Sequence, residues 1–134
     1  IIDNINSYIN SNNLRDRVET RKYMPINLGS TRLVDTIVYN DDRKPIIVSD
    51  IISPETSKIE DMYMKSLFTL KNLSADSIVK RVFYIPDIDD IPSNISEHIK
   101  YIKENIKKEG LEVNDSKDQK EYIEKLIDDA KKVS

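Results

Sequence analysis

The stretch "TRLVDTIVYNDDRKPIIVSDIIS", residues 31–53, decides the fold that this sequence predicts. Val, Ile and Thr dominate residues 31–39 and 46–52, and β-branched residues of this kind favour strands. The polar residues 41–44 and Pro45 separate the two runs and are typical of a turn. The stretch therefore predicts a β-hairpin.

Each strand of this hairpin carries one acidic residue among apolar neighbours. A turn that is symmetric about Asp42 and Arg43 sets the following pairs opposite each other: Tyr39 and Ile46, Ile37 and Val48, Asp35 and Asp50. Directly opposed residues share a face of the sheet, with Cβ atoms about 4.5–5.5 Å apart. A one-residue bulge would instead send the two aspartates to opposite faces.

Two ionised carboxylates about 5 Å apart repel by about 3 kcal/mol at an effective dielectric constant of about 20. A bound cation, a proton on one member, or screening by water removes this repulsion. Mg²⁺ suits an oxygen-rich site with one or two carboxylates. The residues alone leave two interpretations of Asp35 and Asp50: a divalent-metal site, and ordinary strand-end aspartates in water.

The rest of the chain predicts helices and strands that alternate around the hairpin. We expect helices over residues 1–14, from Ser57, from Asn94 to Gly110 and from Ser116, and strands over residues 17–28, 78–85 and 111–113. Strands separated by helical segments indicate a mixed sheet covered by helices. The expected fold is α/β, with a mixed central β-sheet flanked by α-helices, in a single domain over residues 1–134.

Composition excludes several classes of function. The chain has no cysteine, which excludes disulfides, thiol nucleophiles and Cys-ligated metal sites. Two glycines and one histidine argue against Walker or Rossmann phosphate loops and against zinc. The longest apolar runs, such as "PIIV", are too short to span a bilayer, and no signal peptide is visible. We expect a cytoplasmic protein with no membrane partner.

The chain is acidic overall, but its arginines are concentrated near the N-terminus. The net charge of −3 argues against a general polyanion binder, because non-specific nucleic-acid affinity comes from clustered Lys and Arg. Five of the six arginines nevertheless fall in the first third of the chain. Four of them are candidates for phosphate contacts along one rim of the acidic site: Arg15, Arg17, Arg21 and Arg32. The alternative is that these arginines are scattered surface charges.

The segment "VETRKYMPINLGSTRLVDTIVYNDDRKPIIVSDII", residues 18–52, resembles the nuclease core of the PD-(D/E)xK superfamily. It looks most like the N-terminal nuclease domain of type I restriction enzyme motor subunits. In that family a Glu precedes a strand, an Asp precedes an "IVVY"-like strand, and a "GKP" turn leads to a strand that ends in Glu-x-Lys. Glu19, Asp35 with "TIVY", "RKP" and Asp50 stand at the matching places.

This resemblance implies a restriction-endonuclease-like core, with which the predicted order of elements agrees. It also implies a nuclease dependent on Mg²⁺ or Mn²⁺, with Asp35, Asp50 and Glu19 as metal ligands. The chain departs from the pattern at the lysine position, where it has Ile52. In the family, that lysine positions the attacking water and stabilises developing charge, and a preorganised charge of this kind contributes about 10²–10³ in rate. Lys58 is the candidate for a displaced catalytic lysine, with a solvated first-turn lysine as the alternative.

Three hypotheses about function follow. The leading one is a degenerate nuclease-fold domain, weakly active or inactive, that binds DNA, RNA, a protein partner or a second copy of itself. The second is an active Mg²⁺-dependent phosphodiesterase, with Asp35, Asp50 and Lys58 in catalytic roles. The third is a protein-interaction module with no nucleic-acid role.

Overall fold

The structure is a computed structural model, and it describes residues 2–54 and 57–133. Its helices and strands follow in the order α1 (Ile2–Ser11), β1 (Val18–Pro25), β2 (Thr31–Tyr39), β3 (Pro45–Ile51), α2 (Ile59–Asn72), β4 (Lys80–Tyr84), α3 (Ser93–Lys108), β5 (Glu112–Asn114) and α4 (Gln119–Val133). This order matches the alternation that the hydrophobic pattern predicts.

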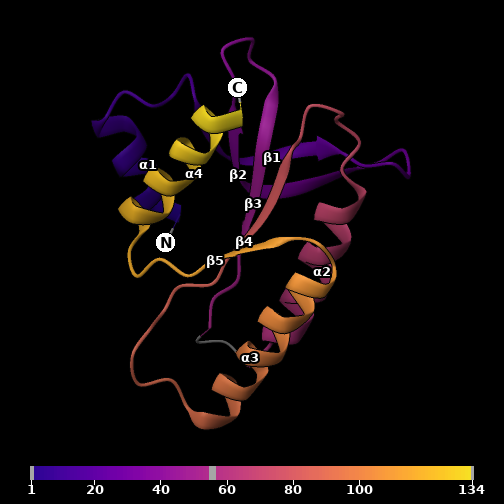
Figure 1. The fold of residues 1–134 in the computed structure, drawn as a ribbon, viewed down its shortest axis with the longest axis vertical. Helices are drawn as coiled ribbons and strands as arrows, with labels where there is room; N and C mark the ends of the chain where they lie inside the picture. Colours follow the sequence, from indigo (N-terminus) through magenta and orange to yellow (C-terminus); the bar gives the residue numbers. More distant parts are fainter. Residues whose placement is uncertain (1, 55–56, 134) are drawn as a thin grey trace.

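The five strands form one mixed sheet in the order β1-β2-β3-β4-β5. Strands β1, β2 and β3 pair antiparallel, and β4 and β5 continue the sheet in parallel with β3. Figure 1 shows α1 and α4 side by side against one face of this sheet, with α2 and α3 against the other. The expectation of an α/β fold with a mixed sheet flanked by helices is therefore confirmed.

Each face of the sheet carries its own hydrophobic core. One core lies under α2 and α3 and contains Val48, Phe83 and Ile102. The other lies under α1 and α4 and contains Ile47 and Tyr84. The central strands β3 and β4 are covered on both faces, which explains the apolar runs "PIIV" in β3 and "VFY" in β4.

The β2–β3 hairpin follows the expected register along most of its length. Ile37 pairs with Val48, as the symmetric turn predicts. The expected pairing of Tyr39 with Ile46 is wrong, because the register shifts between Val38 and Tyr39 and sets Tyr39 against Pro45. The turn itself is organised by the side chain of Asn40, whose Oδ1 accepts the backbone N–H groups of residues 42 and 44, each at 3.0 Å.

Three expected helix starts are wrong in detail. Helix α2 is preceded by Lys58 and α3 by Pro92, and neither makes a side-chain capping bond. Helix α4 is capped by Asp118 rather than Ser116, since Oδ1 of Asp118 accepts the N–H of Glu121 at 2.8 Å. Ser116 is buried and bonds instead to the side chain of Asn114. Within the described ranges, none of the helices has the length and apolar character needed to cross a membrane.

Candidate functional site

Asp35 and Asp50, here called the aspartate pair, lie next to each other on β2 and β3. The backbone N–H of Asp35 donates to Oδ1 of Asp50 at 3.0 Å, and the N–H of Ile51 donates to Oδ2 of Asp35 at 2.8 Å. The regular ladder between the strands ends just before them, at the pairing of Thr36 with Ser49. The two carboxylates therefore take over the role of backbone carbonyls at this end of the hairpin.

The aspartate pair is held in surroundings that disfavour two full negative charges. Asp50 is only 5% exposed, and this burial, together with the charge of Asp35, raises the pKa of Asp50 to about 7. Hydrogen bonds from Asp35 N–H and from Ser66 on α2 oppose that rise. Burial also raises the pKa of Asp35, against the N–H bond from Ile51 and the attraction of Arg21. A proton or a cation is therefore needed to balance the aspartate pair near neutral pH.

The donor set of the aspartate pair fits a small divalent cation. A carboxylate has about four lone-pair positions, so the hydrogen bonds described above leave oxygen positions on each aspartate for a metal. Mg²⁺ is commonly bound through one or two carboxylates, with water and phosphate completing its shell. No cluster of three or more His, Cys, Asp or Glu side chains suited to a metal forms among residues 2–54 and 57–133. The arrangement therefore fits an open two-carboxylate site rather than a closed protein cage.

Glu19, the expected third acidic ligand, has basic partners of its own on the far side of β2. It pairs with Lys22 at 2.9 Å and with Arg43 at 3.7 Å. The hydrogen bond to Lys22 is the largest cause that lowers the pKa of Glu19, and a hydrogen bond with Tyr39 adds to the effect. The structure does not bring Glu19 into one acidic cluster with the aspartate pair.

Ile52 occupies the position at which the nuclease pattern has its lysine. It is fully buried, in the core that α2 and α3 cover. Its backbone N–H donates to the carbonyl oxygen of Tyr84 on β4 at 2.8 Å. An apolar side chain thus fills this position as part of the core.

Lys58 lies about two helical turns before the position on α2 that contacts Asp50. It directly precedes α2, and Ser66, which bonds to Asp50, comes eight residues later. At a rise of about 1.5 Å per residue, the two positions are about 12 Å apart along the helix axis. Lys58 instead lines a cavity between the starts of α2 and α3, together with Ile95 and His98.

The four candidate arginines have different surroundings. The side chain of Arg15 donates to Oδ1 of Asn10 at 2.6 Å, Arg17 forms an ion pair with Asp41, and Arg32 lies over the ring of Phe68 at 5.6 Å. Arg21 differs from the other three. It lies across from Asp35, because Thr20 pairs with Thr36 and Lys22 pairs with Val34 on either side of it.

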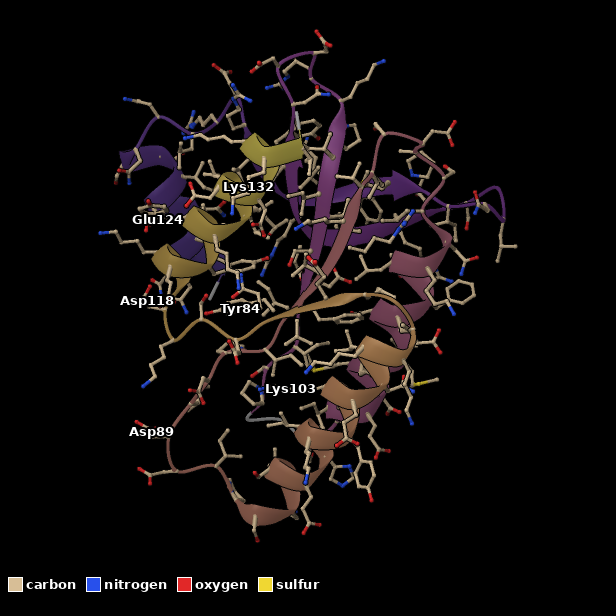
Figure 2. All side chains as sticks on the ribbon, in the orientation of Figure 1. Tyr84, Asp89, Lys103, Asp118, Glu124 and Lys132 are labelled. Carbon is tan, nitrogen blue, oxygen red and sulfur yellow. The ribbon has the colours of Figure 1, made fainter. Side chains whose placement is uncertain are left out.

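Two residues near the aspartate pair, Ser66 and Tyr122, were not predicted from the sequence. Ser66 reaches Asp50 from α2. From the opposite face, the buried hydroxyl of Tyr122 donates to Oγ of Ser49 at 2.6 Å, one residue from Asp50. The sequence indicates a buried polar contact at this place only through Ser49, a small polar residue within the apolar run of β3. Figure 2 shows Asp89 on the loop between β4 and α3, away from the sheet.

Comparison of the chain with protein-family models, with curated proteins and with solved structures finds no match. The interpretation of the aspartate pair therefore depends on its own geometry and on the pattern of residues 18–52.

Proposed function

We propose that this chain is a restriction-endonuclease-like domain of the PD-(D/E)xK type that binds nucleic-acid phosphate through a divalent cation at Asp35 and Asp50, with weak or no hydrolytic activity. The observation that carries this proposal is the aspartate pair. Two carboxylates from neighbouring strands are held side by side, and one of them is buried. A pair of this kind is most stable with a cation or a proton between its members.

The order of elements supports the proposed ancestry. A helix, three antiparallel strands, a helix and a further strand follow one another from α1 to β4. The acidic residues of the pattern, Asp35 and Asp50, lie on the second and third strands. This is the arrangement that the resemblance implies for a nuclease core.

The residues around the aspartate pair support binding more than hydrolysis. A divalent ion bound there supplies a Lewis acid that neutralises phosphate charge. Asp35 and Asp50 would hold that ion and orient it toward solvent-accessible phosphate, since Asp35 is the less buried of the two. Ile52 can neither carry a proton nor stabilise charge on phosphorus, so hydrolysis lacks a contribution of about 10²–10³ in rate.

The proposal is tested by measuring Mn²⁺ binding and nucleic-acid cleavage in parallel. Electron paramagnetic resonance titration at slightly alkaline pH should detect a Mn²⁺ site in the wild type that is lost in Asp50→Asn. Cleavage of DNA and RNA with Mg²⁺ or Mn²⁺ should be slow or undetectable. Absence of Mn²⁺ binding to the wild type overturns the proposed site. Rapid cleavage that Asp50→Ala and Lys58→Ala abolish would instead support the active phosphodiesterase.

A protein partner is the second candidate, and the β1–β2 hairpin favours it. Tyr23 and Leu33 pair across these strands, and they are 70% and 46% exposed. Exposed apolar pairs of this kind often mark contact surfaces. Sedimentation velocity over a range of concentrations tests self-association, and the double variant Tyr23→Ser, Leu33→Ser should abolish any association that this surface mediates.

A further inference from the structure

We infer that Arg21 is the phosphate-binding residue of this site, and that its ligand is the phosphodiester backbone of a nucleic acid. The inference deepens the proposed function and rests on it. It assigns the positive charge of the site to β1, rather than to the position that Ile52 fills or to Lys58.

The first argument is the position of Arg21 in the sheet. The β1–β2 register sets it across from Asp35, and the hydrogen bonds of the aspartate pair set Asp35 beside Asp50. Arg21, Asp35 and Asp50 thus form a row across three neighbouring strands, which are about 4.8 Å apart. The guanidinium attracts the carboxylate of Asp35 and counteracts the rise in its pKa.

The second argument is that Arg21 remains available for a ligand. Its side chain is exposed, and with the residues in ranges 2–54 and 57–133 this side chain forms no hydrogen bond or ion pair. The other arginines of the N-terminal third are each engaged: Arg15 with Asn10, Arg17 with Asp41, Arg32 with Phe68, and Arg43 with Asp16, Glu19 and Tyr39. Arg21 is therefore the arginine of this group that can bind a ligand without losing such a contact.

The third argument is the backbone of Arg21. Its φ is +51°, in the left-handed region, and it lies inside a strand. In that conformation the Cβ atom of a non-glycine residue lies too close to the following carbonyl oxygen, so the backbone is strained. Strain of this kind within a regular element is typical of residues that are held for a function.

Arginine suits binding without hydrolysis. Its guanidinium presents a planar fork that can bond two phosphate oxygens at once, while a cation at the aspartate pair contacts another. A guanidinium keeps its proton in water and in proteins alike, so it cannot remove a proton from water. Arg21 therefore supplies the charge of the motif lysine but not its proton transfer.

The test compares Arg21→Gln with Lys44→Gln, which removes an equal charge from the exposed turn at the other end of the hairpin. The probes are a short labelled DNA duplex and the RNA duplex of the same sequence, each titrated with Mn²⁺ present. We expect Arg21→Gln to weaken binding of whichever duplex the wild type binds by about tenfold or more. The slope of the logarithm of the binding constant against the logarithm of the salt concentration should become shallower by about one, the value for one lost phosphate contact. Arg21→Lys should recover part of the loss, and Lys44→Gln should change affinity less than about threefold.

Arg21→Gly separates binding from folding. Because glycine adopts positive φ freely, this variant should unfold at the same temperature as the wild type or higher, yet bind as weakly as Arg21→Gln. Equal affinities of Arg21→Gln and Lys44→Gln for the duplex would overturn the role of Arg21. If both variants still bind Mn²⁺, the proposed cation site at Asp35 and Asp50 is retained. Failure of the wild type to bind either duplex overturns both the inference and the proposed binding of nucleic acid. Absence of Mn²⁺ binding to the wild type overturns the proposed cation site, and with it the proposed function.

Discussion

The backbone N–H of Asp35 donates to the carboxylate of Asp50, and in return the carboxylate of Asp35 accepts the N–H that follows Asp50 in the chain. The same two side chains thus join β2 to β3 and present the negative charge of the candidate site. The interaction is structural and electrostatic at once, so changes at either aspartate affect stability as well as cation binding.

The free energy of unfolding should fall as pH rises through neutrality because of Asp50. The folded-state pKa is raised to about 7, above the ordinary aspartate value, so Asp50 favours the folded state fully in acid and loses this contribution as pH rises through about 7. A difference of about three pKa units corresponds to about 4 kcal/mol. Urea unfolding from about pH 4 to about pH 8.5 should show the free energy of unfolding falling up to about pH 7 and then levelling off in the wild type, and a flatter profile in Asp50→Asn. Parallel profiles for the two proteins would contradict the raised pKa.

Divalent cations should reverse that loss of stability. A metal competes with the proton for the aspartate pair, so saturating Mn²⁺ should raise the melting temperature more at about pH 8 than at about pH 5.5. At a concentration of about 100 times the dissociation constant, the gain is about 2.7 kcal/mol. Asp35→Asn should lose the effect, whereas Glu19→Gln should retain it, because Glu19 is paired with Lys22 and Arg43. Loss of Mn²⁺ stabilisation in Glu19→Gln would show that Glu19 joins the metal site.

Replacing Ile52 with lysine should damage the core. Ile52 is fully buried among apolar side chains, and a buried unpaired ammonium is strongly unfavourable. We expect Ile52→Lys to lower the free energy of unfolding by about 3 kcal/mol or more, and the control Ile52→Val by about 1 kcal/mol. Chemical denaturation measures both. Wild-type stability in Ile52→Lys would show that the position can hold a lysine directed toward the aspartate pair.

Tyr122 packs on the face of the sheet opposite to Ser66, and removing its hydroxyl should lower the free energy of unfolding. Tyr122 is fully buried, stacks on Tyr84 with ring centroids 4.0 Å apart and donates to Ser49. Tyr122→Phe leaves a buried serine oxygen without its donor and should cost about 1–2 kcal/mol. The exposed hydrogen bond of Tyr8 with Glu124 provides the control, since Tyr8→Phe should cost less than about 0.5 kcal/mol. Equal thermal stability of the two variants would argue against a structural role for the Tyr122–Ser49 bond.

The sequence by itself determined the order of helices and strands, the mixed sheet and the proximity of Asp35 to Asp50. The reason is local: β-branched runs, polar turns and helical spacing depend on near neighbours, and a hairpin relates residues that are close in the chain. The expected helix starts at Ser57, Asn94 and Ser116 were wrong because several polar residues near each start could cap the helix, and only the path of the chain selects among them. Asp118 rather than Ser116 caps α4 for this reason.

Only the tertiary structure decided the surroundings of the aspartate pair. Ser66 bonds to Asp50 from α2, and on the other face of the sheet Tyr122 of α4 donates to Ser49, the neighbour of Asp50. Glu19 is held by Lys22 and Arg43, while Arg21 lies across from Asp35. The burial of the two aspartates, their hydrogen-bond partners and the shifts in their pKa depend on atoms that are distant in the chain and adjacent in space. A pattern of residues that are neighbours in the chain cannot predict them.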